Sequence, residues 1–190
     1  MLPASYFAFE GGILIYSWLL EILQTEYELV RRMKESDRGG VYLIRHRTDG
    51  KPLVLRHFTG NAEVYQKLLH YTCSNLPVTL EVASQGEEHL ILEEYIQGDT
   101  LDFLLKDTLF TVKETREIVT QVCRALWVLH SLGAVHRDVK PDNIILRGDE
   151  AVLIDFDAAR LYKPEEDTDT QILGTTGFAA PEQYGLSQTD

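Results

Sequence analysis

A short polar stretch in the second half of the chain carries the residues best suited to chemistry. Residues 136–144 read His-Arg-Asp-Val-Lys-Pro-Asp-Asn-Ile, and Asp155 follows in the sequence Ile-Asp-Phe-Asp. Asp138 could accept a proton, and Lys140 could neutralise a phosphate. The side-chain oxygens of Asn143 and Asp155 are ligands suited to Mg²⁺. Such a set fits phosphoryl transfer, which needs an oriented nucleophile and positive charge around the transferred group.

Three motifs in this order resemble those of eukaryotic-type (bacterial) Ser/Thr protein kinases. Residues 136–143 are similar to the catalytic loop H-R-D-x-x-x-x-N, and residues 155–157 to the metal-binding D-F-G, with Asp157 in place of Gly. Residues 180–182 match A-P-E, the end of the activation segment. The resemblance covers roughly residues 26–190. It implies transfer of the ATP γ-phosphoryl group to a protein hydroxyl, with Mg²⁺ as cofactor.

The resemblance also gives roles to the catalytic-loop residues. It implies that Asp138 and Lys140 are catalytic, and Lys140 at this spacing resembles Ser/Thr kinases more than tyrosine kinases. His136 resembles the packing histidine of the motif. Arg137 resembles the arginine that binds a phosphorylated activation loop, which would order that loop by charge-assisted contacts.

Threonines of the segment between Asp155 and the A-P-E motif are the candidate phosphorylation sites. They are Thr168, Thr170, Thr175 and Thr176. Acidic neighbours suggest a mobile loop around the first two, and we expect autophosphorylation at one of them. The last two fit the substrate-facing segment and are expected to contact Asp138 and Lys140.

The nucleotide-binding half departs from the family pattern at its glycine-rich loop. The motif G-x-G-x-x-G-x-V, aligned on Val41, places Lys34, Ser36 and Gly39 at the three glycine positions, with Gly40 beside the last. A loop with fewer glycines approaches phosphates less closely. We therefore expect reduced ATP affinity.

A second departure concerns the cation that binds the nucleotide phosphates. Residues 53–56 match the strand motif V-A-I-K, with Arg56 in place of Lys. The charge is kept, but the planar guanidinium is bulkier than an ammonium group. Glu63 is the best candidate for the helix glutamate that pairs with this cation.

Residues 93–98, Glu-Glu-Tyr-Ile-Gln-Gly, resemble the hinge whose backbone groups bind adenine. Glu93 would then occupy the gatekeeper position, unless the register slips by one residue and Leu92 does. The predicted ATP-binding residues are Ser36, Gly39, Gly40, Val41, Arg56, Glu63, Glu94, Ile96, Asn143 and Asp155.

Apolar segments and the turn signals between them predict five strands in the first half of the chain, and residues 41–47 alternate apolar and polar residues as a half-buried strand does. The five strands cover residues 27–33, 41–47, 52–58, 79–84 and 89–96. Residues 61–71 have helical spacing. The resemblance implies an α+β, two-lobed kinase-like fold, with a five-stranded sheet and one helix in the N-lobe and an incomplete, mainly helical C-lobe.

The second half begins as helix. Thr111 and Glu114 form a capping box, and apolar residues then recur at helical spacing until Gly133. Residues 144–146 and 151–154 predict a short hairpin, which would bring the two predicted metal ligands to neighbouring strand ends.

The N-terminus carries an apolar stretch, residues 11–23, that lies outside the resemblance. It is too short to span a bilayer, which takes about 20 apolar residues, and Glu21 interrupts it. A helix packed on the small lobe or on a partner is favoured over a membrane-peripheral anchor. We therefore divide the chain into an extension at 1–25, an N-lobe at 26–96 and a partial C-lobe at 97–190.

The overall composition limits which binding partners and which cellular compartment are expected. A net charge of −12 argues against nucleic acid and anionic membranes and is compatible with a basic protein substrate. The two cysteines have no metal-ligand spacing and predict reduced thiols in a cytoplasmic protein. No transmembrane span is expected.

Two further functions stay open beside an active kinase. Arg56, Asp157 and the sparse glycine loop are compatible with a pseudokinase or kinase fragment that binds nucleotide or partners without efficient turnover. A small-molecule phosphotransferase is disfavoured, because residues 174–182 resemble a peptide-docking segment. The chain ends at Asp190, where the family's large lobe continues, so we expect exposed apolar surface and possible self-association through the C-lobe or the N-terminal helix.

Overall fold

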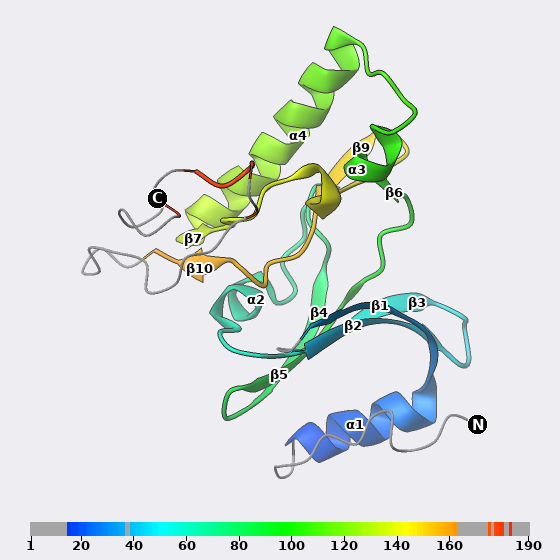
Figure 1. Ribbon diagram of the computed structural model, residues 1–190. Helices are drawn as coiled ribbons and strands as arrows, with labels where there is room; N and C mark the ends of the chain where they lie inside the picture. The colour runs from blue at the N-terminus through cyan, green and yellow to red at the C-terminus, as the bar shows by residue number, and fades with distance from the viewer. Residues whose placement is uncertain (1–14, 37–38, 163–174, 176, 181–182, 184–190) are drawn as a thin grey trace. The chain divides into compact units, whose positions relative to one another are not determined.

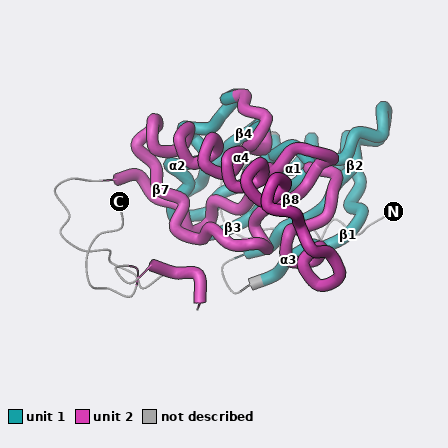
Figure 2. Tube along the Cα trace, turned by 90° about the horizontal axis from the view of Figure 1, so that it is seen from above, with its two compact units in different colours: residues 1–71, 78–95 teal, residues 72–77, 96–190 magenta. Residues whose placement is uncertain are grey.

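The computed structural model of the chain describes residues 15–36, 39–162, 175, 177–180 and 183. The chain divides into two compact units (Figure 2). The first comprises Met1–Tyr71 and Val78–Tyr95, and the second comprises Thr72–Pro77 and Ile96–Asp190. Each unit is described by itself.

The first unit is built on a five-stranded sheet with the strand order β1-β2-β3-β5-β4 (Figure 1). All neighbouring strands are antiparallel. The strands are β1 (Tyr27–Ser36), β2 (Gly39–His46), β3 (Pro52–Thr59), β4 (Thr79–Gln85) and β5 (Glu88–Glu94). The five strands predicted from the sequence are confirmed, with ends that differ by up to three residues.

One face of this sheet is covered by helix α1 (Ile15–Glu26), as Figure 1 shows. Leu19 and Leu23 of the helix are 5% and 0% exposed and join one core cluster with leucines of the sheet. The sheet leucines of this cluster are Leu53, Leu55, Leu90 and Leu92. Alternate residues of a strand point to one face, so the i, i+2 spacing of these leucines builds the surface on which α1 packs. The helix predicted within the N-terminal apolar stretch thus packs on the sheet of its own chain.

Helix α2 (Glu63–Leu68) buries Val64, Tyr65 and Leu68. The ring of Tyr65 lies 5.7 Å from that of Phe58 in β3. The helix is shorter than the predicted range of 61–71. It ends because Leu69 turns to extended backbone and bridges to Thr79 of β4.

The second unit contains two helices, a 3₁₀ helix and five short strands among its described residues. They are β6 (Asp99–Thr100), α3 (Leu101–Leu104), α4 (Val112–Ser131), β7 (Ala134–Val135), η2 (Pro141–Asn143), β8 (Ile144–Arg147), β9 (Glu150–Leu153) and β10 (Arg160–Leu161). Strands β6, β8 and β9 form one small antiparallel sheet, and β7 pairs with β10.

Helix α4 begins at the predicted capping box. The Thr111 hydroxyl accepts a hydrogen bond from the Glu114 amide at 3.3 Å, and the Glu114 carboxylate accepts one from the Thr111 amide at 2.7 Å. Val122, Ala125 and Leu129 form its buried stripe. The predicted core role of this helix is confirmed.

Residues 72–77 belong to the second unit because Asn75 is hydrogen-bonded there. Its side-chain amide is buried and donates to Oε1 of Gln121 at 3.0 Å and to the Ala151 carbonyl at 2.9 Å. Its own carbonyl accepts from the Leu153 amide at 2.9 Å. The segment is thereby fixed to α4 and β9. Within the described part of the chain, no helix has the length and apolarity needed to cross a membrane.

Candidate functional site

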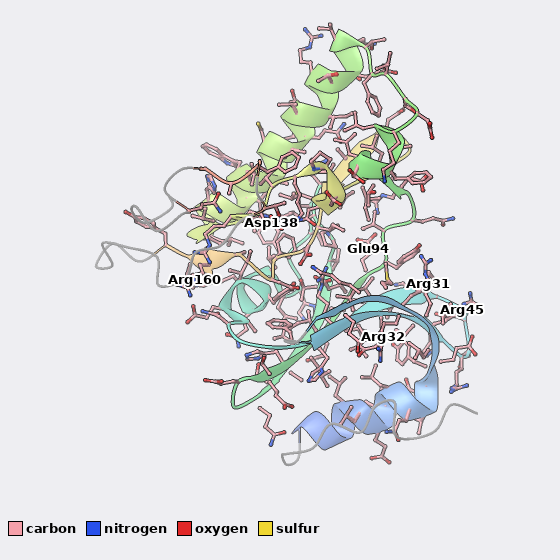
Figure 3. All side chains as sticks on the ribbon, viewed as in Figure 1. Arg31, Arg32, Arg45, Glu94, Asp138 and Arg160 are labelled. Carbon is pink, nitrogen blue, oxygen red and sulfur yellow. The ribbon has the colours of Figure 1, made fainter. Side chains whose placement is uncertain are left out.

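Asp138, Lys140 and Thr175 form a hydrogen-bonded cluster in the second unit, in the region where Figure 3 labels Asp138. The Thr175 hydroxyl donates to Oδ1 of Asp138 at 2.7 Å. Nζ of Lys140 lies 2.7 Å from that hydroxyl and 2.8 Å from Oδ2 of Asp138. The contact expected between Thr175 and the two predicted catalytic residues is therefore present.

Asn143 completes the surroundings of the Asp138 carboxylate. Its buried side-chain amide donates to Oδ2 of Asp138 at 2.9 Å and to the Asp138 carbonyl at 2.8 Å. Burial raises the pKa of Asp138, but the hydrogen bonds and charge of Lys140, with the bonds from Thr175 and Asn143, hold the pKa below its ordinary value. The carboxylate is therefore ionised at neutral pH and acts as an acceptor for hydroxyl and ammonium groups.

His136 connects the catalytic loop to the segment that carries Asp155. The Asp138 amide donates to Nδ1 of His136 at 3.3 Å, so Nε2 carries the proton and donates to the Ile154 carbonyl at 3.2 Å. Its ring packs edge-on against Phe156, with centroids 5.6 Å apart. Burial lowers the pKa of the imidazole, which agrees with this neutral form. The packing role that the resemblance implies fits these contacts.

The predicted hairpin brings Asn143 and Asp155 to adjacent strand ends. β8 and β9 pair with Ile144 opposite Leu153, and the Ile154 amide donates to the Asn143 carbonyl at 2.9 Å. The two predicted metal ligands therefore flank the same end of this strand pair.

Two residues of the cluster region adopt left-handed backbone conformations without being glycine. Arg137 has φ +64° and Asp155 has φ +70°. Such conformations cost on the order of 1–3 kcal/mol each and persist only where the surroundings enforce them. Around Arg137, its Nε donates to the Ala158 carbonyl at 2.9 Å, and the Gln183 side chain donates to its carbonyl.

In the first unit, the predicted phosphate-loop residues meet at the start of β2. Ser36 pairs with Gly39 across the β1–β2 connection, and Val41 lies opposite Arg56 of β3. Gly39 has φ +146°, and a Cβ there would lie 1.9 Å from the His57 carbonyl oxygen. The close approach of β2 to β3 therefore requires this glycine, whatever the loop binds.

Arg56 forms a buried ion pair with Glu93 of β5. Its Nε donates to Oε2 at 2.6 Å, and the two side chains are 7% and 3% exposed. Glu93 lies on the same face of the sheet as Arg56. Leu92 lies on the opposite face, in the core that α1 covers. Glu63 is exposed and its carboxylate accepts from the Asn61 side chain at 3.0 Å. Its pairing with Arg56 stays a prediction.

A family model described as "Protein kinase domain" matches residues 27–189. The chain belongs to this protein kinase family. Its fold is a partial two-lobed kinase fold, with the five-stranded antiparallel sheet of the N-lobe.

The chain is similar to curated bacterial and yeast proteins. It is 32% identical over 139 residues to "Serine/threonine-protein kinase D" of Synechocystis, covering 69% of this chain and 27% of that protein. It is 31% identical over 140 residues to "Serine/threonine-protein kinase PknA" of Nostoc, with 69% and 25% covered. Identity to "Probable serine/threonine-protein kinase RTK1" of Saccharomyces cerevisiae is 29% over 176 residues, with 80% and 28% covered. The chain spans about a quarter of the length of these relatives.

The second unit offers two oxygen donors that fit Mg²⁺. The amide nitrogen of Asn143 is used by Asp138, which leaves Oδ1 as the donor toward a metal. Asp155 supplies a carboxylate. Mg²⁺ takes one or two protein oxygens together with nucleotide phosphates, so this donor set suits it.

The Asp157 substitution of the D-F-G motif is compatible with the backbone. Among the described residues other than glycine, positive φ occurs at His70, Arg137 and Asp155, so position 157 does not need the freedom of glycine. The Asp157 side chain is exposed, and its amide lies 3.5 Å from Oδ1 of Asp155.

The predicted hinge residues lie in different units. Glu94 ends β5, where Figure 3 labels it, and its carboxylate accepts from the Val78 amide at 3.3 Å. Ile96 is buried in the second unit. Thr168, Thr170, Thr176 and Glu182 lie outside the described residues.

Sequence reasoning missed two residues that hold the site. Gln183 follows the A-P-E motif directly, and nothing in its spacing signals that it contacts Arg137. The partner of Arg56 had a usable signal. Arg56 and Glu93 each follow three consecutive apolar residues of a strand, and opposite charges on two buried strands favour a pair.

Proposed function

We propose that this chain is a Ser/Thr protein kinase that uses Mg²⁺ and ATP to phosphorylate a protein hydroxyl. The observation that carries the proposal is the cluster of Asp138, Lys140 and Thr175. In it, one ionised carboxylate and one ammonium group bind the same hydroxyl oxygen from two sides, at 2.7 Å each.

This geometry supports a division of labour between the two catalytic residues. Asp138 accepts a hydrogen bond from the incoming hydroxyl, as it does from Thr175, and takes its proton while the new oxygen–phosphorus bond forms. The bond from the γ-phosphorus to the bridging oxygen breaks, and ADP leaves. Lys140 neutralises charge on the transferred group. Mg²⁺, held by Asn143 and Asp155, would supply charge neutralisation at the phosphates.

The test is γ-phosphate transfer from labelled ATP to a generic basic protein. Asp138→Asn keeps the size of the side chain and removes the base, so transfer should fall by roughly 10²–10⁴-fold. Asp107→Asn, on the exposed stretch after α3, is the matched control and should leave the rate unchanged. Equal rates for wild type and Asp138→Asn would refute the mechanism.

The second candidate is a pseudokinase, and the substitution at Arg56 favours it. Arg56 occupies the position of the family lysine and is bound by Glu93 at 2.6 Å. A pseudokinase would bind Mg·ATP without transfer, and Arg56→Lys would raise transfer above that of wild type. Measuring nucleotide binding and transfer on the same two proteins separates the candidates.

Further parts of the proposal concern partners and compartment. The substrate is a protein, the compartment is the cytoplasm, and nucleic acid is not a partner; the net charge of −12 and the free Cys73 and Cys123 support these assignments. Self-association is a further part of the proposal. It is supported by exposed apolar side chains on α4, where Val112 and Trp127 are 88% and 77% exposed. Light scattering at two protein concentrations tests self-association.

Autophosphorylation at Thr168 or Thr170 is also part of the proposal. Mass spectrometry after incubation with Mg·ATP tests for it.

A further inference from the structure

The buried pair of Arg56 and Glu93 joins two neighbouring strands on one face of the sheet. In the β3–β5 register Val54 lies opposite Glu93 and Arg56 lies opposite Ile91, so the charged residues are diagonal neighbours. Nε of Arg56 lies 2.6 Å from Oε2 of Glu93. Both residues depart from what the family motif and an apolar strand would place there.

Stability does not account for this pair. A buried ion pair is often no more stabilising than two apolar residues of the same volume, because both charges lose their hydration. Oε1 of Glu93 is buried and has no hydrogen-bond partner among the described residues. Thr79 lies opposite Glu93 in β4, and its hydroxyl is also buried without a hydrogen-bond partner in the described part of the chain. A pair that leaves such atoms unsatisfied points to a role in function.

The atom that Glu93 binds indicates what this role is. A lysine ammonium is a compact charge on a flexible stem, whereas a guanidinium is a planar fork whose direction matters for phosphate binding. A hydrogen bond to Nε fixes the plane of that fork. We propose that Glu93 is a positioning residue: it holds Arg56 by Nε so that the guanidinium binds the nucleotide phosphates in one orientation.

This inference rests on the ATP binding of the proposed function and adds a residue to it. Glu93 acts through Arg56 and needs no contact with the nucleotide. Arg56 and Glu93 then act together, and the arginine is functional because the glutamate orients it.

The experiment measures the dissociation constants of adenosine and of Mg·ATP. The first divided by the second gives a ratio that reports the phosphate contribution to binding. Glu93→Met removes the acceptor and should reduce this ratio about tenfold, since the Arg56 guanidinium loses the hydrogen bond that orients it toward the phosphates. Glu93→Gln keeps an oxygen acceptor for Nε and should retain most of the ratio. Glu81→Met, an exposed glutamate of β4, is the matched control and should leave the ratio unchanged.

A double variant protects the test against misfolding and checks the route of action. Glu93→Met removes the carboxylate that faces the buried Arg56, whereas the double variant of Arg56→Met with Glu93→Met carries neither of these two buried charges and is expected to fold. Arg56→Met alone and the double variant should then have the same ratio, because Glu93 has nothing left to position.

Three results would overturn the inference: an unchanged ratio in Glu93→Met, an equal loss in Glu93→Gln, or a further loss on adding Glu93→Met to Arg56→Met. In each of these, wild type still binds Mg·ATP more tightly than adenosine, and the proposed function stands. If wild type binds no nucleotide, the proposed function fails and this inference fails with it.

Discussion

The Thr175 hydroxyl donates a 2.7 Å hydrogen bond to Oδ1 of Asp138, across 37 positions of the chain. The Thr175 hydroxyl oxygen also accepts a hydrogen bond from Nζ of Lys140. A hydroxyl can donate and accept at once, which an apolar residue of the same shape cannot do. Thr175 therefore orders the carboxylate and the ammonium group with respect to each other.

Replacing Thr175 with valine should slow phosphoryl transfer while leaving the fold intact. Valine has the shape of threonine but makes neither hydrogen bond, so Asp138 and Lys140 lose a shared partner. We expect about a tenfold lower kcat. Thr175→Ser keeps the hydroxyl and should stay within about twofold of wild type. A valine variant as active as the serine variant would contradict the ordering role.

The pH dependence of stability should reveal the buried His136. Its folded pKa is lowered by burial, so the unfolded chain takes up a proton near pH 6.5 that the folded chain does not. The contribution of neutral His136 to the unfolding free energy is fully present above pH 6.5. It is lost as the pH decreases below that value, by at most about 1.4 kcal/mol per pH unit. Denaturant unfolding at several pH values measures this slope.

The control for that slope is His136→Phe, which keeps an aromatic ring against Phe156. Its stability should fall less steeply below pH 6.5 than that of wild type. Burial also lowers the pKa of His57, but this residue contributes equally to the pH dependence of both proteins. Identical slopes would show that His136 does not titrate differently on folding.

Gly39 and Gly60 offer a matched test of steric exclusion. Their φ values are +146° and +141°, but a Cβ at Gly39 would lie 1.9 Å from the His57 carbonyl oxygen, whereas Gly60 has open space. Both alanine variants carry the backbone strain, and only Gly39→Ala adds the clash. We expect Gly39→Ala to cost at least about 2 kcal/mol more in unfolding free energy than Gly60→Ala. Equal costs would mean that β2 can move away from β3.

Helix α1 should contribute to the stability of the first unit. Leu23 is fully buried, so Leu23→Ala should lower the unfolding free energy by about 2–5 kcal/mol. Leu109→Ala removes the same atoms from a side chain that is 98% exposed and should change it by less than about 0.5 kcal/mol. Urea unfolding of both variants measures the difference. A Leu23→Ala variant as stable as Leu109→Ala would show that α1 does not stay on the sheet.

Local patterns in the sequence were sufficient for much of the fold. Apolar segments separated by turn signals predicted the five strands, and the capping box at Thr111 predicted the start of α4. The contact of Thr175 with Asp138 followed from motif order. These features depend on residues close in sequence or on a motif that fixes the geometry.

Contacts between distant residues were harder to predict. The pair of Arg56 and Glu93 spans 37 positions and depends on the order of β3 and β5 in the sheet. Asn75 draws residues 72–77 into the second unit through partners on α4 and β9. The predicted helix over 61–71 is cut short by a bridge to β4, since tertiary pairing overrides helical spacing.

The covering of the sheet by α1 has a consequence for where this folding unit begins. The family match starts at residue 27, but the leucine face of β3 and β5 is completed by Leu19 and Leu23, which precede it. A protein cut at the family boundary would present a strip of leucines on an open sheet, a surface prone to aggregation. The residues that match the family are therefore fewer than the residues needed to close this core.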